Sequence, residues 1–548
     1  MRIDKVYIKK FKNLSEFNID LNENEMKSVL LGQNATGKSN FIEALVLIFK
    51  YLDLEKEPPQ KLELQYRIEY YCRDRKIYVN YLDGKYSFKV QRKISSLGNS
   101  ARYRVYSKYD KTGKEIIVPD SLSKTDFFRN KDSYLPKYVF TYYSGISNRL
   151  KEHFNEHQRK FYDKIIKPNF KDTDIDQLRK LFYVQSVHSH FVLLAYYSYE
   201  SDKSKSIKFL KEVLGIEDLE SILFILRKPR WNGKGDVRFF GADGLVKKFL
   251  EKVWKLSLAP IYSDEKIPVD FRSEPTQKRL YLFIKDKQNL KKLAETYNSN
   301  TEFFKALEST YISDLIEEVR VKVKKKFVDG SVTFKELSEG EQQLLTVMGL
   351  LKFTKDEESL ILLDEPDTHL NPIWKWRYLE FLDEVVQNEK NTQIVINTHD
   401  PLVIGGLTKE QVRIFTTDSK GKILAEQPDI DPRGLGVEGI LTSELFGLPT
   451  TLDEETQQKL DRRNELLVKQ QSEKLNDNEN GELQKIFGEL EELGFSKTFR
   501  DPLFQKFIVA YKSRIKTTTK LSYTKEELQE QNKVALEILD ELQNEEDK

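Results

Sequence analysis

The first part of the chain combines alternating apolar positions with a helical pattern, and a glycine-rich loop separates the two. Apolar and polar residues alternate over 6–19, and residues 28–31 form an apolar run directly before Gly32. Alternation of this kind is typical of β-strands. From about 39 to 50, apolar residues recur three and four positions apart, which is the spacing of an amphipathic helix. The predicted order is therefore strand, loop and helix.

The periodicity changes twice in the next part of the chain. Residues of about 60–145 contain alternating runs, with Asp83-Gly84 as a hairpin turn signal, and predict an antiparallel β layer. From about 148 to 318 the periodicity is mainly helical, with a loop over 227–244 and a short strand near 280–284. We therefore expect a mainly α-helical insertion.

Strand and helix signals alternate again after residue 318. Such alternation predicts an α/β fold with a largely parallel core. Residues of about 443–548 form charged helices that are broken at 477–481. Strands are predicted at 319–326, 331–334, 360–363 and 393–397, and helices from residue 340 and over about 373–388. We expect four parts: 1–147 and 319–442 as two parts of one α/β domain, 148–318 as the insertion, and 443–548 as a helical C-terminal region.

Length and composition favour a soluble protein of several structural units. The chain has 548 residues, more than one hydrophobic core usually supports, and 39% of them are hydrophobic and 32% charged. Its longest apolar runs fall far short of the ~20 residues that span a bilayer. The N-terminus lacks the apolar region of a signal peptide. We therefore expect a cytoplasmic protein with no membrane partner.

Cysteine content and net charge limit the kinds of covalent link, metal site and partner that the chain can have. The single cysteine, Cys72, excludes an internal disulfide and a multi-cysteine metal site, and its strand-like surroundings predict a buried thiol. The formal net charge is only +2, so bulk charge does not indicate a nucleic-acid-binding protein. His153 with His157, and His188 with His190, lack carboxylates at metal-ligand spacing, so no metal site is predicted there.

The segment from Gly32 to Ser39 matches the pattern G-x-x-x-x-G-K-[ST] between a predicted strand and a predicted helix. Glycines at these positions let backbone N–H groups surround phosphates, while Lys38 reaches the β- and γ-phosphates and Ser39 binds Mg²⁺. The pattern therefore predicts a P-loop for ATP and Mg²⁺. Its predicted binding residues are Gly32, Asn34, Ala35, Thr36, Gly37, Lys38, Ser39 and Asn40.

A second motif is the apolar run 360–363 followed by Asp364 and Glu365. A buried strand that ends in two carboxylates can place Asp364 near the Mg²⁺ and Glu365 where it polarises the attacking water. Taken alone, the run also fits a buried strand followed by a solvated acidic turn. Its combination with Lys38 favours Asp364 as a metal ligand and Glu365 as a catalytic residue.

A third motif, Leu-Ser-Glu-Gly-Glu-Gln-Gln at 337–343, opens a predicted helix between the P-loop and the acidic strand. The Ser338 hydroxyl, the Gly340 N–H group and the positive end of the helix dipole form a second place where phosphate can bind. Ser338 and Glu341 also match a capping box. The two interpretations are compatible.

Taken in order, Gly32 to Ser39, 337–343, 360–365 and 396–400 resemble the Walker A, signature, Walker B and switch-histidine motifs of ABC ATPases. The resemblance implies a homodimer or higher oligomer in which the signature of one subunit covers ATP on the P-loop of another. Ser338 and Gly340 would then act in trans, His399 would contact the γ-phosphate as a catalytic residue, and residues 367–371 would cross the dimer interface. His369, in this last loop, also fits an ordinary surface position.

Two further positions of that family are less clear in this sequence. The region of the family's glutamine loop, 139–145, offers no glutamine, so no residue is predicted for that role. Lys12 resembles the basic N-terminal residue that contacts nucleotide in SMC-like ATPases, and it fits a solvated turn lysine equally well.

Local basic patches leave nucleic acid, either DNA or RNA, open as a partner. One strand face over 319–326 would be basic, able to neutralise phosphates or simply to face solvent. A loop around Trp231 combines basic, aromatic and glycine residues and suits backbone contact and base stacking. The residues concerned are Arg320, Lys322, Lys324 and Lys326 on the strand, and Lys228, Arg230, Lys234 and Arg238 in the loop.

The long stretch between the P-loop and the signature motif resembles the SMC-like and OLD-like branch of ABC ATPases. It holds no heptad repeat long enough for an SMC coiled coil, and the helical residues after 446 do not suggest the nuclease domain of OLD proteins. Over its whole length, including 441–449, the chain resembles the ATPase subunits of Septu-type anti-phage defence, which also occur with some retrons. That resemblance implies a separate HNH endonuclease partner that is gated by the ATP state.

Two other functions stay open from the sequence. An SMC-like DNA-repair clamp would use the basic strand face to hold DNA. A nucleotide sensor would bind ATP tightly and hydrolyse it so slowly that Glu365→Gln changed nothing.

Overall fold

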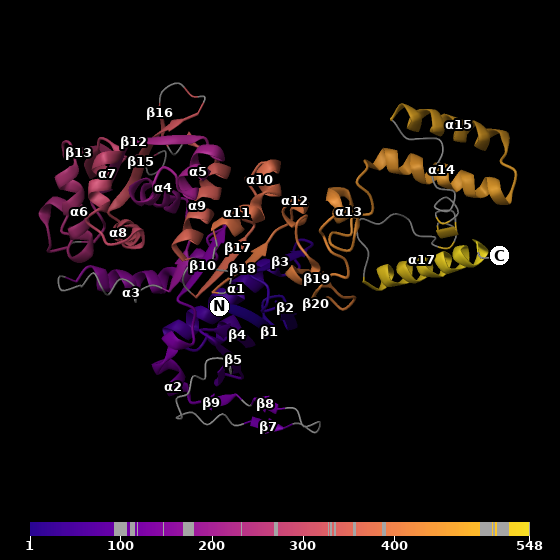
Figure 1. The fold of residues 1–548 in the computed structure, drawn as a ribbon, viewed down its shortest axis with the longest axis horizontal. Coiled ribbons are helices and arrows are strands. Elements are labelled where there is room, and N and C mark those ends of the chain that lie inside the picture. Colours follow the sequence, from indigo (N-terminus) through magenta and orange to yellow (C-terminus); the bar gives the residue numbers. More distant parts are fainter. Residues whose placement is uncertain are drawn as a thin grey trace. The chain divides into compact units, whose positions relative to one another are not determined.

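The chain forms two compact units in the computed structural model (Figure 1). The first unit consists of Met1–Leu30, Gly37–Val403 and Glu410–Arg413, and the second of Leu31–Thr36, Ile404–Lys409 and Ile414–Lys548. The residues that the structure describes are 1–92, 107–109, 115–117, 119–145, 147–167, 180–231, 233–267, 272–326, 328, 331–333, 336–354, 358–385, 391–493, 507, 510–511, 514 and 525–546.

A six-stranded antiparallel sheet is formed by the N-terminal part of the first unit, in the order β2-β1-β4-β5-β6-β9. Buried residues alternate with more exposed ones in these strands, and in β4 the buried set includes Tyr66, Ile68 and Tyr70. Cys72 ends β4, and burial raises the pKa of its thiol to about 12. The predicted antiparallel layer and buried thiol are confirmed. The strands are β1 (Arg2–Phe11), β2 (Leu14–Asp20), β4 (Gln65–Cys72), β5 (Arg75–Leu82), β6 (Lys85–Arg92) and β9 (Asp120–Leu122).

The second sheet has the order β11-β10-β17-β18-β3-β19-β20, and its strands from β11 to β3 are parallel. Every residue of β17 and β18 is buried, which is typical of parallel strands that are covered on both faces. Helix α1 (Lys38–Leu54) follows β3 and is buried along most of its length. The predicted α/β fold with a parallel core is confirmed. The strands are β3 (Lys27–Gly32), β10 (Tyr138–Tyr143), β11 (Leu181–Tyr183), β17 (Ser359–Asp364), β18 (Thr392–Asn397), β19 (Val412–Thr417) and β20 (Ile423–Glu426).

The insertion contains helices and also a third sheet, with the antiparallel order β13-β14-β12-β15-β16. The prediction of a mainly helical insertion therefore missed the strands β12 (Ile216–Arg227) and β13 (Ile261–Lys266). The pairing of β12 with β15 shifts register after Ile216 and again after Leu219. Because each bulge adds one residue, the buried side chains Ile216, Leu219 and Ile222 recur three positions apart, which resembles a helical period.

Strand β15 (Ile316–Lys325) pairs with both β12 and β16 (Ser331–Thr333), so it belongs to the third sheet. It begins before the predicted boundary at 318/319, and the four-part division of the chain stays a prediction. The remaining elements of the first unit are β7 (Ser107–Tyr109), β8 (Glu115–Ile117), β14 (Thr276–Ile284), α2 (Lys124–Arg129), α3 (Asn155–Ile165), α4 (Val187–Tyr199), α5 (Lys205–Glu212), α6 (Gly244–Leu256), α7 (Lys287–Ala294), α8 (Asn300–Ile312), α9 (Glu339–Thr354), α10 (Pro372–Trp376) and α11 (Tyr378–Val385), with α12 (Pro401–Ile404) at its end.

The second unit contains the helical C-terminal region, with α13 (Gly436–Thr442), α14 (Glu454–Ser472), α15 (Asp477–Glu492) and α17 (Lys525–Glu546). Helices α14 and α15 pack through a small apolar cluster that includes Leu466 and Leu490. The break predicted at 477–481 lies earlier, because Asn476 and Glu479 form a capping box at which α15 begins. Among the described residues, no helix is long and apolar enough to cross a membrane.

Candidate functional site

The carboxyl ends of β3, β17 and β18 meet at one edge of the parallel sheet. The register places Asp364, the last residue of β17, opposite Asn397, the last residue of β18. Asn397 also lies opposite Leu30 of β3, just before the P-loop. Ligands of open α/β sheets bind outside the carboxyl ends of the strands, so this edge is the candidate site.

The P-loop adopts a backbone that its glycines permit. Gly32 has a φ of 139° and Gly37 a φ of 89°. A side chain at Gly32 would place its Cβ 2.3 Å from the carbonyl oxygen of Phe415, so only glycine fits. Thr36 closes the turn by donating from Oγ1 to the carbonyl oxygen of Gln33 at 2.8 Å. Gly37 then leads directly into α1, whose N-terminus suits an anionic phosphate.

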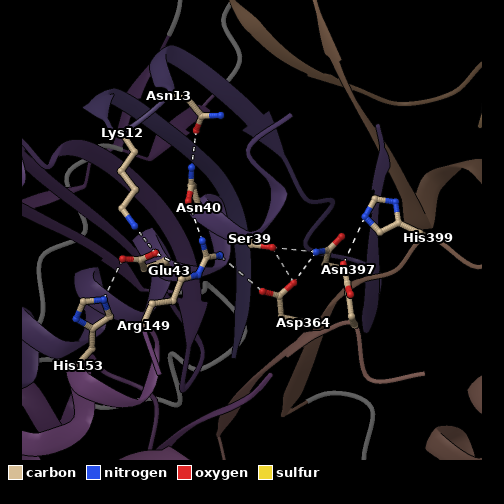
Figure 2. Close-up of polar contacts among 11 residues, drawn as sticks. Lys12, Asn13, Ser39, Asn40, Glu43, Arg149, His153, Asp364, Asn397 and His399 are labelled. Carbon is tan, nitrogen blue, oxygen red and sulfur yellow. Dashed lines mark hydrogen bonds and ion pairs between the residues drawn. The ribbon is translucent and has the colours of Figure 1, made fainter. Parts of the chain in front are cut away.

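Asp364 is fully buried, and its two carboxylate oxygens have different surroundings (Figure 2). Oδ1 accepts hydrogen bonds from Ser39 Oγ at 3.1 Å and from the side-chain amide of Asn397. Oδ2 has no hydrogen-bond partner among the described residues. Burial raises the pKa of Asp364, while the hydrogen bonds from Asn397 and Ser39 act in the opposite direction. A free carboxylate oxygen beside a serine hydroxyl fits a hard cation such as Mg²⁺.

Three further side chains lie around the Ser39 hydroxyl and the Asp364 carboxylate, namely those of Lys38, Glu365 and His399. Burial lowers the pKa of Lys38 to about 8, although Glu365 and Asp364 favour its charged form. His399 Nε2 lies 3.5 Å from Glu365 Oε1. Burial, with a smaller effect from the charge of Lys38, lowers the pKa of His399 to about 4, so its imidazole is neutral near pH 7. Glu365, the first residue after β17, has a φ of 53°, a conformation that is strained for a residue other than glycine.

Ser338 and Gly340 lie at a second position, the start of α9. The predicted capping box is confirmed, because the backbone N–H of Ser338 donates to Glu341 Oε2 at 2.8 Å and the backbone N–H of Glu341 donates to Ser338 Oγ at 3.3 Å. A Cβ at Gly340 would lie 2.5 Å from the carbonyl oxygen of His369. The signature segment and the loop after β17 therefore lie in direct contact.

That loop also contacts the segment that carries His399. Thr398 Oγ1 donates to Asp367 Oδ2 at 2.8 Å, and Lys375 Nζ lies 2.7 Å from Asp400 Oδ2. Burial raises the pKa of Asp367 to about 6. The loop thus connects the start of α9 with the switch-histidine segment. His369 is 41% exposed and pairs with Glu339 at 3.2 Å, so it is a surface residue in this structure.

Sequence reasoning missed a polar cluster beside the P-loop helix. Glu43 is buried on α1, where its Oε2 accepts from Lys12 Nζ at 2.6 Å and its Oε1 lies 3.0 Å from His153 Nε2. Burial would raise the pKa of Glu43, but hydrogen bonds from His153 and Lys12 lower it below the ordinary value. Lys12 is therefore both paired with Glu43 and exposed to solvent, and its predicted contact with nucleotide stays a prediction. A lone acid within the apolar run of α1 is the signal that could have revealed this cluster.

The basic patches predicted from the sequence occupy exposed positions. On β15, Arg320, Lys322 and Lys324 are exposed while the alternating valines are buried, so the basic stripe exists as one sheet face. In the loop, Trp231 donates from Nε1 to the carbonyl oxygen of Ser313 at 2.7 Å. A cavity of about 250 Å³ opens beside it, lined by Tyr162, Trp231, Lys234, Asp243 and the loop glycines.

Several known proteins match parts of this chain. The AAA ATPase domain family matches residues 1–404. Septu protein PtuA from Bacillus mycoides (strain KBAB4) is 28% identical over 158 residues, which are 27% of this chain and 22% of PtuA. The retron Vc95 probable ATPase from Vibrio cholerae serotype O1 biovar El Tor is 34% identical over 76 residues, 14% of each protein. The matched stretches thus span less than a quarter of either relative.

Among solved structures, the SMC head domain from Thermotoga maritima aligns with 78% of this chain and 100% of its own, at a TM-score of 0.29 and 12% identity. The sequence matches agree with the predicted resemblance to ATPases of the Septu and retron-associated kind.

Proposed function

Because this chain belongs to the AAA ATPase domain family, we propose that it binds ATP with Mg²⁺ at the edge formed by β3, β17 and β18 and hydrolyses it between two copies. One observation carries the proposal: Ser39 Oγ lies 3.1 Å from Asp364 Oδ1, and the neighbouring Oδ2 has no hydrogen-bond partner in the described part of the chain. A hydroxyl and a carboxylate placed in this way can ligate one cation together.

Each residue of the site then has a defined task. Bound Mg²⁺ supplies positive charge for the β- and γ-phosphates. Ser39 and Asp364 hold the cation, and Lys38 contributes its charge to the same phosphates. Glu365 orients the attacking water and accepts its proton. Neutral His399, beside Glu365, donates a hydrogen bond to the terminal phosphate.

A second copy supplies the remaining phosphate contacts. Ser338 is exposed at the start of α9, where the backbone N–H groups and the helix dipole favour an anion. Its hydroxyl donates to Glu341 Oε2 at 3.0 Å in this state, so it has to turn toward the phosphate when the partner's nucleotide arrives. Gly340, packed against His369, keeps the two segments of this surface close together.

The test compares Lys38→Ala and Glu365→Gln with wild type. We expect Lys38→Ala to abolish ATP binding. Glu365→Gln should still bind ATP, but its rate of hydrolysis should fall by about 100-fold or more. Sedimentation of Glu365→Gln with ATP should show a trapped dimer. Glu384→Gln, an exposed acid on α11, is the matched control. If Glu365→Gln hydrolyses ATP at the wild-type rate, the chain is a nucleotide sensor instead, and the catalytic role of this edge is wrong.

For the biological role, we propose an ATPase subunit of a bacterial anti-phage defence complex that regulates a separate HNH endonuclease and is not itself a nuclease. Partial sequence similarity to Septu protein PtuA and the retron Vc95 probable ATPase supports this role. Affinity purification of tagged Glu365→Gln with ATP, from cells that carry the neighbouring genes, tests it by mass spectrometry. Recovery of an HNH protein in amounts equal to the ATPase supports the complex, whereas recovery of this chain alone contradicts it.

A DNA clamp of the SMC-like kind is the second candidate function, and the exposed basic stripe of β15 favours it. In that case the double charge reversal Lys322→Glu/Lys324→Glu should remove stimulation of ATP hydrolysis by DNA and leave basal hydrolysis unchanged. Equal stimulation of the variant and the wild type would exclude the stripe as the DNA surface.

A further inference from the structure

One basic side chain at the site was not among the sequence predictions. Arg149 follows β10, and the last residue of β10 lies opposite Asp364. Figure 2 shows the guanidinium of Arg149 pointing toward Asp364, Asn40 and Glu43. Its Nη2 atom lies 4.0 Å from Asp364 Oδ2 and its Nε atom lies 3.9 Å from Glu43 Oε2. Arg149 thus faces Oδ2 of Asp364, the oxygen that accepts no hydrogen bond from the described residues.

These contacts are too long for a closed salt bridge, because N–H···O hydrogen bonds are about 2.9 Å long. Among the described residues, the guanidinium makes a single hydrogen bond, from Nη1 to Asn40 Oδ1, and it measures 3.5 Å. Nε of Arg149 is buried with no hydrogen-bond partner in the described residues. The guanidinium therefore offsets the charge of two carboxylates, while most of its N–H groups make no hydrogen bond to the part of the chain that the structure describes.

The side chain is also placed where it can move. Arg149 is 35% exposed, whereas Asp364 is fully buried, so the guanidinium reaches the carboxylate from the solvent side. Its backbone segment is held on α1 by His153, whose Nε2 lies 3.0 Å from Glu43 Oε1. A rotation of the Arg149 side chain needs no change in that anchor. The ring of Tyr143, with its centre 5.9 Å away, offers an apolar surface along which the guanidinium can slide.

We propose that Arg149 binds the terminal phosphate of the nucleotide held by the P-loop of its own subunit. Without ligand, its charge offsets Asp364 and Glu43. Asp364 would hold a divalent cation in place of this contact, and the like charge of the cation would favour an Arg149 side chain turned away from the carboxylate. Arg149 then directs its planar set of N–H donors to the γ-phosphate, an anion that suits this geometry. The proposal rests on the proposed binding of ATP with Mg²⁺ at this edge.

The location of Arg149 agrees with the gap that the sequence left. The region in which the family has a glutamine, 139–145, ends β10 and holds none. Arg149 comes four residues after that region, and its guanidinium lies beside the carboxylates of Asp364 and Glu43. In this proposal a charged side chain from the following segment serves the site, where the family would use a neutral glutamine.

The test measures dissociation constants of ATP and ADP, with Mg²⁺ and with a chelator, on the Glu365→Gln background so that ATP persists. With Mg²⁺, Arg149→Ala should weaken ATP binding about tenfold, and ADP binding much less, because ADP lacks the γ-phosphate. The affinity of Arg149→Lys for ATP should lie between those of Arg149→Ala and the parent, since lysine keeps the charge and loses the planar set of donors. With the chelator, the variant and the parent should bind ATP with similar affinity.

Two controls separate this inference from the proposed function. Arg159 is an exposed arginine on α3, and Arg159→Ala should change the affinity for neither ATP nor ADP. Equal weakening of ATP and ADP by Arg149→Ala, or none, overturns the role of Arg149. Unchanged ATP binding in Lys38→Ala would instead contradict the nucleotide site itself. If Arg149→Ala lowers the melting temperature strongly, Arg149→Lys and Arg149→Gln carry the same comparison.

Discussion

The parallel sheet and the third sheet of this chain bury their residues in opposite ways. Strands β17 and β18 are buried at every position, and their polar chemistry begins where they end, at Asp364 and Asn397. Strand β15 buries valines on one face and exposes Arg320, Lys322 and Lys324 on the other. The parallel sheet thus has a point-like site, in which the polar groups gather around Asp364 and Asn397. The third sheet is surface-like, because its charges are spread along one face of β15.

The difference predicts how each sheet responds to substitution. At the edge of the parallel sheet, Ser39, Asn397 and Arg149 all converge on Asp364, so residues there act as a unit and single changes are large. On the third sheet, lysines that contacted nucleic acid would each meet a separate phosphate, so single changes should be small and additive. Substitutions in each sheet can therefore break or sharpen the comparison.

Asp364→Asn should have the largest effect. Loss of the charge removes a cation ligand, and ATP hydrolysis should fall by about 1000-fold. The folded protein should become more stable at the same time, because burial raises the pKa of Asp364 and a neutral amide avoids the desolvation of a buried charge. Steady-state hydrolysis and melting temperature, measured on the same sample, check both signs. A variant that loses stability along with activity would show that Asp364 supports the fold rather than the site.

Gly340→Ala should follow in size. Its Cβ would lie 2.5 Å from the carbonyl oxygen of His369, so the start of α9 and the loop after β17 must separate. We expect about 1–3 kcal/mol lower stability and a loss of the ATP-trapped dimer in sedimentation. Gly488→Ala on α15, where no atom lies within 4 Å of the added Cβ, is the matched control and should not destabilise the protein. Dimer formation that survives in Gly340→Ala would place the partner contact elsewhere.

The point-like site and the basic face of β15 were largely predictable from the sequence, whereas strands β12 and β13 of the third sheet were not. The P-loop, Asp364, Glu365 and His399 occur at spacings that a motif records, and their elements lie in the predicted order. The structure confirms the parallel core that brings Ser39 and Asp364 together. The proposed roles of these residues in catalysis stay predictions.

The failures have physical reasons. The bulges of β12 change its apolar spacing from two toward three, so a strand resembled a helix. Arg149 and Glu43 belong to no contiguous motif, and the packing of α1 beside the segment after β10 brings Arg149 near both Glu43 and Asp364. The contact between Arg149 and Asp364 joins distant segments and leaves no pattern in a single sequence, whereas Glu43 leaves one signal, a lone acid in the apolar run of α1.

Asp367 gives a smaller, pH-dependent test of the point-like site. Burial raises its pKa from 3.8 to about 6. The folded pKa lies above the unfolded value, so the contribution to stability is fully present below about pH 4 and is lost as pH rises through 6. The free energy of unfolding of Asp367→Asn should thus rise relative to that of wild type as the pH increases from about 4 to about 6, and the difference should reach about 1–3 kcal/mol at pH 7. Urea unfolding at pH 4.5 and pH 7 measures the gain, and a difference that does not change with pH would contradict the burial argument.

Lys322 and Lys324 test the surface-like sheet, where the smallest effects are expected. Both are exposed on β15 between buried valines, so alanine there should leave folding intact. If this face contacts nucleic acid, each single variant should weaken binding about threefold and reduce the slope of log affinity against log salt by about 1. The double variant should show the product of the two losses, because the two phosphate contacts are independent. Titration of single-stranded and duplex DNA at several salt concentrations measures these values. Complete loss from one lysine would mean that the third sheet also concentrates its function at a point, and the contrast between the two sheets would fail.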